Sequence, residues 1–139
     1  MQLAEFDDSF ARVFGDQVGL TTGGDAFFRD FYGAFVAKSP EVARLFSRTD
    51  MERQASMLKH SLYEMVTFYA TGIASDNLER LAALHHRIGI PGMLYDLWMD
   101  ALVETAASYD PEFSGETGLA WRVAMAPGLA YFRHHTARD

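Results

Sequence analysis

The sequence predicts an all-α domain. Apolar residues recur every three or four positions through most of the chain, as in amphipathic helices, and the alternation typical of strands is missing. Glycines and prolines divide these apolar runs into about seven segments. The chain has 139 residues, of which 49% are hydrophobic. It is therefore long enough for one domain around a single core, and we expect that domain to span residues 1–139.

The first two predicted helices are rich in phenylalanine. The first begins near Asp7, and a stretch with four glycines, residues 15–24, separates it from the second. The second begins near Asp25. Its apolar face is formed by Phe27, Phe28, Phe31, Tyr32, Phe35 and Val36.

Capping residues mark the next two helices. Ser39 suits an N-cap and Pro40 a first turn, so they predict a short helix that ends around Phe46. Thr49 followed by Glu52 is typical of a capping box, which predicts that a fourth helix starts there. A glycine at position 72 ends this fourth helix.

Three more helices follow. We expect the fifth to be capped by Asp76 and closed by Gly89, and the sixth to begin at Pro91. The last follows Gly115 and contains Pro127, which should bend it or mark a late start.

Composition excludes several classes of function. The net charge of −7 argues against a basic face for nucleic acid. The absence of cysteine excludes disulfides, thiolate nucleophiles, iron–sulfur clusters and thiolate zinc sites. The N-terminus turns acidic at once, and no run of residues is long and apolar enough to span a membrane. We therefore expect a soluble cytoplasmic protein.

Three polar residues, Tyr32, Gln54 and His85, fall on or beside apolar stripes of three different helices. Each alone is most simply explained by a local hydrogen bond within the core. Together they suggest that the three side chains face one object. One histidine cannot hold a bare ion against water, but it can hold iron that four porphyrin nitrogens already bind. A lone histidine in an apolar cleft, if it implies a metal, therefore implies a prosthetic group.

Several segments resemble bacterial globins, namely the single-domain haemoglobins and the globin part of flavohaemoglobins. Residues 31–46 (FYGAFVAKSPEVARLF) resemble the second and third helices of that family, and residues 51–58 (MERQASML) resemble its distal helix. Residues 81–85 (LAALH), followed by Gly89, Ile90 and Tyr95, resemble the proximal segment, and Trp121 fits the start of the last helix. The resemblance covers nearly the whole chain.

The resemblance implies a globin fold, with helices in a three-over-three sandwich around a haem b (iron protoporphyrin IX) pocket. His85 matches the iron ligand, Gln54 the residue over the open iron site, and Phe46 the ring that wedges against haem. The other residues expected to contact haem are Tyr32, Leu58, Phe31, Phe28, Leu84, Ile90, Tyr95 and Trp98. Arg53, Lys59, His60 and Arg87 are candidates to pair with the haem propionates.

The chain also departs from the family pattern. Lys59 stands where the family has an apolar residue, so a register shifted by one would put Arg53 in the distal position instead of Gln54. Met125 and Thr136 stand where flavohaemoglobins carry a Tyr and a Glu that help to polarise the proximal histidine. This weakens any expectation of strong oxygen activation.

We therefore expect a protein that reversibly binds dioxygen, for storage, delivery or sensing, as a monomer or homodimer. Nitric oxide and carbon monoxide are further candidate ligands. One alternative is a nitric oxide dioxygenase that works with an external reductase, and another is a haem-free globin-like signalling domain. The iron would be five-coordinate, or six-coordinate with a second ligand such as His60.

Overall fold

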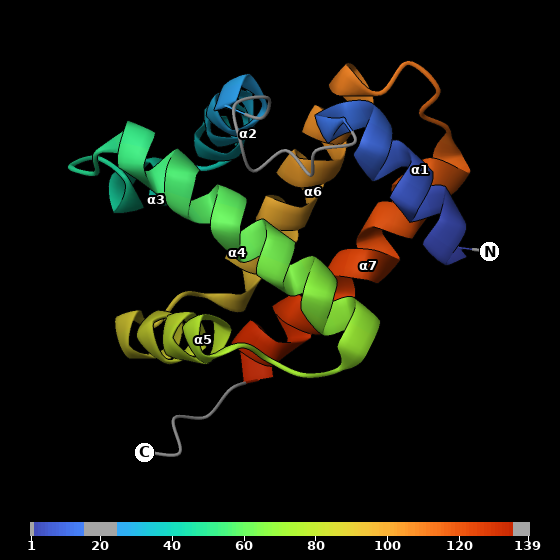
Figure 1. Cartoon of the computed structure of the whole chain (residues 1–139). Helices are drawn as coiled ribbons and strands as arrows, with labels where there is room; N and C mark the ends of the chain where they lie inside the picture. Colours follow the sequence, from blue (N-terminus) through green and yellow to red (C-terminus); the bar gives the residue numbers. More distant parts are fainter. Residues whose placement is uncertain (1, 16–24, 135–139) are drawn as a thin grey trace.

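Helices account for the architecture of the part of the chain that the computed structural model describes, residues 2–15 and 25–134 (Figure 1). No strand occurs in these two ranges. The helices are α1 (Gln2–Phe14), α2 (Asp25–Ala37), α3 (Pro40–Leu45), α4 (Met51–Thr71), α5 (Asp76–Ile88), α6 (Gly92–Tyr109) and α7 (Gly115–His134). The predicted all-α class is confirmed. None of the described helices is long and apolar enough to cross a membrane, and the cytoplasmic location stays a prediction.

The helices pack as three over three. Helices α1, α4 and α5 each lie against α7, and α4 also packs on α2. Helices α2, α6 and α7 form the second layer, and the short α3 extends from the end of α2 (Figure 1). Two long helices, α4 and α7, therefore cross at the centre of the molecule, and α5 lies beside both of them.

Helix ends follow the sequence closely, with three corrections. Ser39 caps α3 as predicted, and Gly72 and Gly89 close α4 and α5 with positive φ angles of 75° and 78°. The expected capping box is wrong, because Asp50 rather than Thr49 is the N-cap of α4 and accepts from two backbone N–H groups. Ser75 rather than Asp76 caps α5.

The third correction concerns α1, which begins at Gln2 and not near Asp7. In the last helix, Pro127 lies within a continuous α7. The expected break at residues 16–24 lies outside the described residues, although Gly15 before it has a φ of 83°.

A buried polar network joins the first helix to the last two. Trp121 is fully buried, and its Nε1 donates to Ser9 Oγ at 2.8 Å. Ser9 Oγ in turn donates to Asp110 Oδ2 at 2.6 Å, and Arg12 Nε donates to Asp110 Oδ1 at 2.6 Å. Each polar group therefore has a partner, as buried polar groups require. The network anchors α1 away from the site described next.

Candidate functional site

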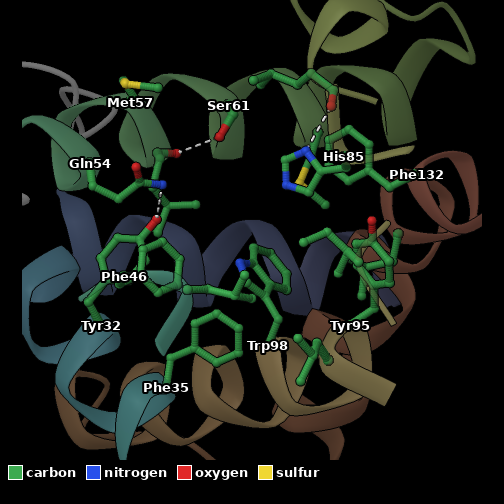
Figure 2. Close-up of a pocket in the computed structure, with 17 residues that line it drawn as sticks. Tyr32, Phe35, Phe46, Gln54, Met57, Ser61, His85, Tyr95, Trp98 and Phe132 are labelled. Atoms are coloured by element: carbon green, nitrogen blue, oxygen red, sulfur yellow. Dashed lines mark hydrogen bonds between the residues drawn. The ribbon is translucent and has the colours of Figure 1, made fainter. Parts of the chain in front are cut away.

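A pocket lies between α4, α5 and the ends of α2, α6 and α7 (Figure 2). About 820 Å³ of space lies between its side chains, including the part that opens to solvent. Most of the lining is apolar or aromatic. The lining residues are Tyr32, Phe35, Leu45, Phe46, Gln54, Met57, Leu58, Ser61, Met65, Leu81, His85, Ile90, Leu94, Tyr95, Trp98, Leu129 and Phe132.

His85 stands on α5, one turn from the C-terminal end of that helix. Its Nδ1 lies 2.7 Å from the backbone carbonyl oxygen of Leu81. A carbonyl only accepts hydrogen bonds, so Nδ1 carries the proton and Nε2 presents its lone pair. Burial lowers the pKa of His85, and the bond to Leu81 opposes part of this effect. The imidazole is therefore held neutral, which is the form that binds a metal.

Tyr32 and Gln54 form a polar pair across the pocket from His85 (Figure 2). Gln54 Nε2 donates to the Tyr32 hydroxyl oxygen at 3.0 Å. Burial raises the pKa of Tyr32 to about 12, although the hydrogen bond from Gln54 acts in the opposite direction. The hydroxyl therefore keeps its proton at neutral pH and, since its oxygen is the acceptor for Gln54, that proton is available to another acceptor.

The hydroxyl of Ser61, which also lines the pocket, is already hydrogen-bonded. Ser61 Oγ donates to the Leu58 carbonyl oxygen at 3.1 Å.

The pocket opens to solvent beside Leu45 and Met57, which are 43% and 44% exposed. Exposed apolar side chains at a mouth suit a ligand that is itself apolar and that covers them when bound.

Most of the residues expected at the site lie on this pocket. They are His85, Tyr32, Phe46, Gln54, Leu58, Ile90, Tyr95 and Trp98. Of the two residues considered for the distal position, Gln54 lines the pocket, whereas Arg53 is exposed and is not part of the lining. His60 is exposed as well, so it does not stand opposite His85.

Three residues expected to line the pocket lie elsewhere. Phe28 stacks on Phe14 of α1, with ring centroids 5.7 Å apart, because its face of α2 turns toward α1. Phe31 is fully buried behind the pocket wall, edge-on to Trp98 at 5.7 Å. Leu84 is 37% exposed, because adjacent residues on a helix diverge by about 100° and His85 points inward.

Sequence reasoning missed the contribution of α7. Phe132 and Leu129 line the pocket from the end of the chain, together with Met65 of α4. Phe132 belongs to the predicted apolar stripe of the last helix, but a stripe does not tell which part of the core it faces. Of the two positions that depart from flavohaemoglobins, Met125 is fully buried and Thr136 lies outside the described residues.

The potential metal ligands in the pocket fit a metal ion that is already bound by a prosthetic group. No group of three or more His, Asp or Glu side chains that could bind a bare ion occurs within residues 2–15 and 25–134. A single neutral imidazole in an apolar pocket is the pattern in which haem iron is bound. The residues present therefore fit an iron porphyrin.

The four cations considered for the propionates differ in exposure. Arg53, His60 and Arg87 are exposed, whereas Lys59 is only 8% exposed. Their role toward a carboxylate ligand stays a prediction.

Comparison with solved structures gives an informative match. No protein-family model and no curated protein matches the chain significantly. A solved structure from Pseudomonas aeruginosa PAO1, described as structurally highly homologous to a human hemoglobin, superposes with a TM-score of 0.79. It is 33% identical over 96% of each chain.

The chain belongs to the family of this haemoglobin-like protein. Its fold is globin-like, as the order and packing of its helices also indicate. In this globin-like chain, the pocket lies between α4 and α5 and holds one inward imidazole facing a Tyr–Gln pair.

Proposed function

We propose that this globin-like chain binds haem b, with His85 as the protein ligand to iron, and reversibly binds dioxygen. The observation that supports this is the His85 imidazole, whose Nδ1 is occupied by the Leu81 carbonyl while its ring faces an apolar pocket (Figure 2). Bound haem would supply ferrous iron with one coordination position open to a small gas. Storage, delivery and sensing of dioxygen are all served by such binding.

The chain's own residues would hold the group and keep water away from it. Phe46, Leu58, Ile90 and Trp98 provide apolar walls on different elements. Apolar walls favour a flat hydrophobic ligand, since each Å² of apolar surface removed from water contributes about 25 cal/mol. They would also slow oxidation of the iron, because they exclude water from its surroundings.

Tyr32 and Gln54 would set the preference among gases. Both can donate a hydrogen bond into the pocket. Dioxygen takes on more negative charge in a haem pocket than carbon monoxide does, and therefore gains more from a preorganised donor. We expect tight dioxygen binding with slow release.

The surroundings of His85 favour a binding role over oxygen activation. Its hydrogen-bond partner in the described part of the chain is a neutral backbone carbonyl, not a carboxylate. A neutral partner leaves the imidazole less electron-rich than a carboxylate would. Turnover of nitric oxide to nitrate would in addition require a source of electrons.

The decisive experiment is haem uptake by the purified chain, followed by absorption spectra of the reduced form with and without carbon monoxide. We expect one haem per chain and a carbon monoxide spectrum that is lost in His85→Ala. His86→Ala changes the adjacent, exposed histidine and serves as the matched control. A chain that stays colourless with haemin, or a His85→Ala variant that binds haem and carbon monoxide as the wild type does, would overturn the proposal and favour a haem-free domain.

A second experiment tests the distal donors. Tyr32→Phe should speed dioxygen dissociation about fivefold, the effect of one hydrogen bond of about 1 kcal/mol, and should change carbon monoxide dissociation much less. Tyr63→Phe, on the exposed face of α4, is the control. Equal effects on the two gases would contradict the donor role. Rapid nitrate production with a reductase and nitric oxide would favour the enzymatic alternative.

A further inference from the structure

A second hollow lies behind the distal wall of the pocket, on the surface formed by α2, α3 and the start of α4. It encloses about 880 Å³, including the part that is open to solvent. We call it the distal groove. Its lining residues are Arg29, Tyr32, Gly33, Val36, Ala43, Phe46, Met51 and Glu52.

Two residues belong to both hollows. Tyr32 and Phe46 line the pocket from one side and the distal groove from the other. Their rings meet edge to face, with centroids 5.4 Å apart and an interplanar angle of 66°. The wall between the groove and the pocket is therefore formed at this point by two aromatic side chains.

One of these two side chains is held more firmly than the other. Tyr32 is only 6% exposed and is the acceptor of the Gln54 hydrogen bond. Phe46 is partly exposed and caps the end of α3, a helix of six residues of which only Val42 is buried. Few buried contacts make local opening easy. Of the two aromatic side chains in the wall, Phe46 is therefore the one that can move more easily.

The chemistry of the groove suits small uncharged molecules. Gly33, Val36, Ala43 and Met51 present little or no polar side-chain surface. A Cβ atom at Gly33 would meet nothing within 4 Å, so the groove is open at this point of α2.

The charged pair at the groove does not close it. Arg29 Nη1 lies 3.7 Å from Glu52 Oε1, and the two side chains are 52% and 77% exposed. An exposed ion pair of this kind contributes little free energy and exchanges readily with water.

We propose that the distal groove is an access route by which a small apolar gas reaches the pocket, with Phe46 as the gate. This proposal rests on the proposed function, because the gas that uses the route is taken to be the ligand of the pocket. The wider mouth at Leu45 and Met57 is the competing route.

The first test needs no haem and so separates this proposal from the previous one. Xenon, an apolar atom of gas-like size, is dissolved in a solution of the ¹⁵N-labelled chain, and amide shifts are followed. We expect saturable shifts at Gly33, Val36 and Ala43, because an apolar site binds xenon. Shifts confined to the pocket, with none at these three amides, would overturn the groove as a gas site.

The second test measures passage of dioxygen through the wall. Zinc protoporphyrin takes the place of haem, and quenching of its triplet state by dioxygen reports access without any bond to the metal. Gly33→Phe fills the groove and should slow quenching by about threefold or more, because passage then requires a conformational change. Gly33→Ala is the size control and should have little effect. Phe46→Ala should speed quenching.

Unchanged quenching in Gly33→Phe would overturn the proposal. If quenching is at the same time slower in Met57→Trp, access is assigned to the mouth at Leu45 and Met57 instead. If the chain takes up neither haem nor zinc protoporphyrin, the proposed function fails, and the xenon experiment still decides whether the groove accepts a gas.

Discussion

The imidazole of His85 lies parallel to the phenyl ring of Phe132, with ring centroids 5.1 Å apart and an interplanar angle of 5°. Tyr95 flanks both rings, with its centroid 6.4 Å from each. The His85 ring is thus fixed by a stacked neighbour from α7 and by the hydrogen bond to Leu81 within α5. This joins His85 to the last helix of the chain, which sequence reasoning did not foresee.

We expect Phe132→Leu to weaken haem retention more than it weakens the fold. Leucine fills part of the volume, so the free energy of unfolding should fall by about 1 kcal/mol. The His85 ring, however, loses the flat surface that orients it, so haem transfer to an excess of apomyoglobin should be faster. Phe68→Leu, which alters a ring packed on Tyr131 outside the pocket, is the control. Equal haem loss in the two variants would contradict an orienting role for Phe132.

The helix boundaries were predictable because individual residues mark them locally. Ser39, Gly72 and Gly89 mark helix ends through their own backbone preferences, and the structure confirms all three. Two of the three errors fall where two neighbouring residues compete for one cap, as at Thr49 and Asp50. Both side chains can accept from the first turn, and only the fold decides which one does.

The candidate site was predictable only in part. His85 and Gln54 follow from polar residues on apolar stripes and from the family resemblance, and both line the pocket. Phe28 and Phe31 share a stripe with Tyr32, but a wide stripe faces several neighbours, and these two rings pack on α1 and on Trp98. Phe132 lies 47 positions after His85, and nothing local links two such distant positions.

The Asp110 carboxylate should make the free energy of unfolding depend on pH in the acid range. Its hydrogen bonds from Arg12 hold its pKa at about 2, below its ordinary value of 3.8, and the bond from Ser9 adds to this. A depressed pKa contributes stability above the unfolded value, and that contribution is lost as the pH falls from about 4 through about 2. The loss should be about 2 kcal/mol in the wild type and absent from Asp110→Asn.

Urea unfolding measured across this pH range provides the check. Asp100→Asn is the control, because its carboxylate pairs with Arg122 at the surface, where both side chains are about 45% exposed. We expect that variant to follow the wild-type profile, since surface pairs contribute about 0–1 kcal/mol. If the free energy of unfolding falls with pH as steeply in Asp110→Asn as in the wild type, the acid sensitivity belongs to other carboxylates.

Tyr32 and Tyr109 should titrate later in alkaline solution than an ordinary tyrosine. Burial is the main cause that raises the pKa of both Tyr32 and Tyr109 to about 12, and the hydrogen bond to Asp30 adds to it for Tyr109. A raised pKa favours the protonated folded state, so this contribution to stability is present below about pH 10 and is lost as the pH rises toward about 12.

The ultraviolet absorbance of tyrosinate measures this titration, with circular dichroism recorded in parallel to follow unfolding. Tyr32→Phe and Tyr109→Phe should each remove one late-titrating group. The assignment fails for either of these two tyrosines if its removal leaves the late phase intact.

Replacing Gly128, which lies where α4 and α7 cross, should lower the stability of the fold. A Cβ atom at Gly128 would lie 2.6 Å from Met65 Cε and 3.0 Å from Met65 Cγ. Gly128→Ala should therefore lower the free energy of unfolding by about 1–3 kcal/mol through overpacking, although alanine is the better helix former. Gly33→Ala, where nothing lies within 4 Å of the new atom, should instead raise it by about 0.5–1 kcal/mol.

A double-mutant cycle shows whether the contact itself is the cause. If overpacking against Met65 explains the loss, Gly128→Ala should cost less in a Met65→Ala background, where the space is free, and the two changes should be strongly non-additive. Additive effects would mean that the glycine is needed for some other reason, such as the backbone next to Pro127. Because Met65 also lines the pocket, Gly128→Ala should alter the spectrum of a bound porphyrin as well as the stability of the fold.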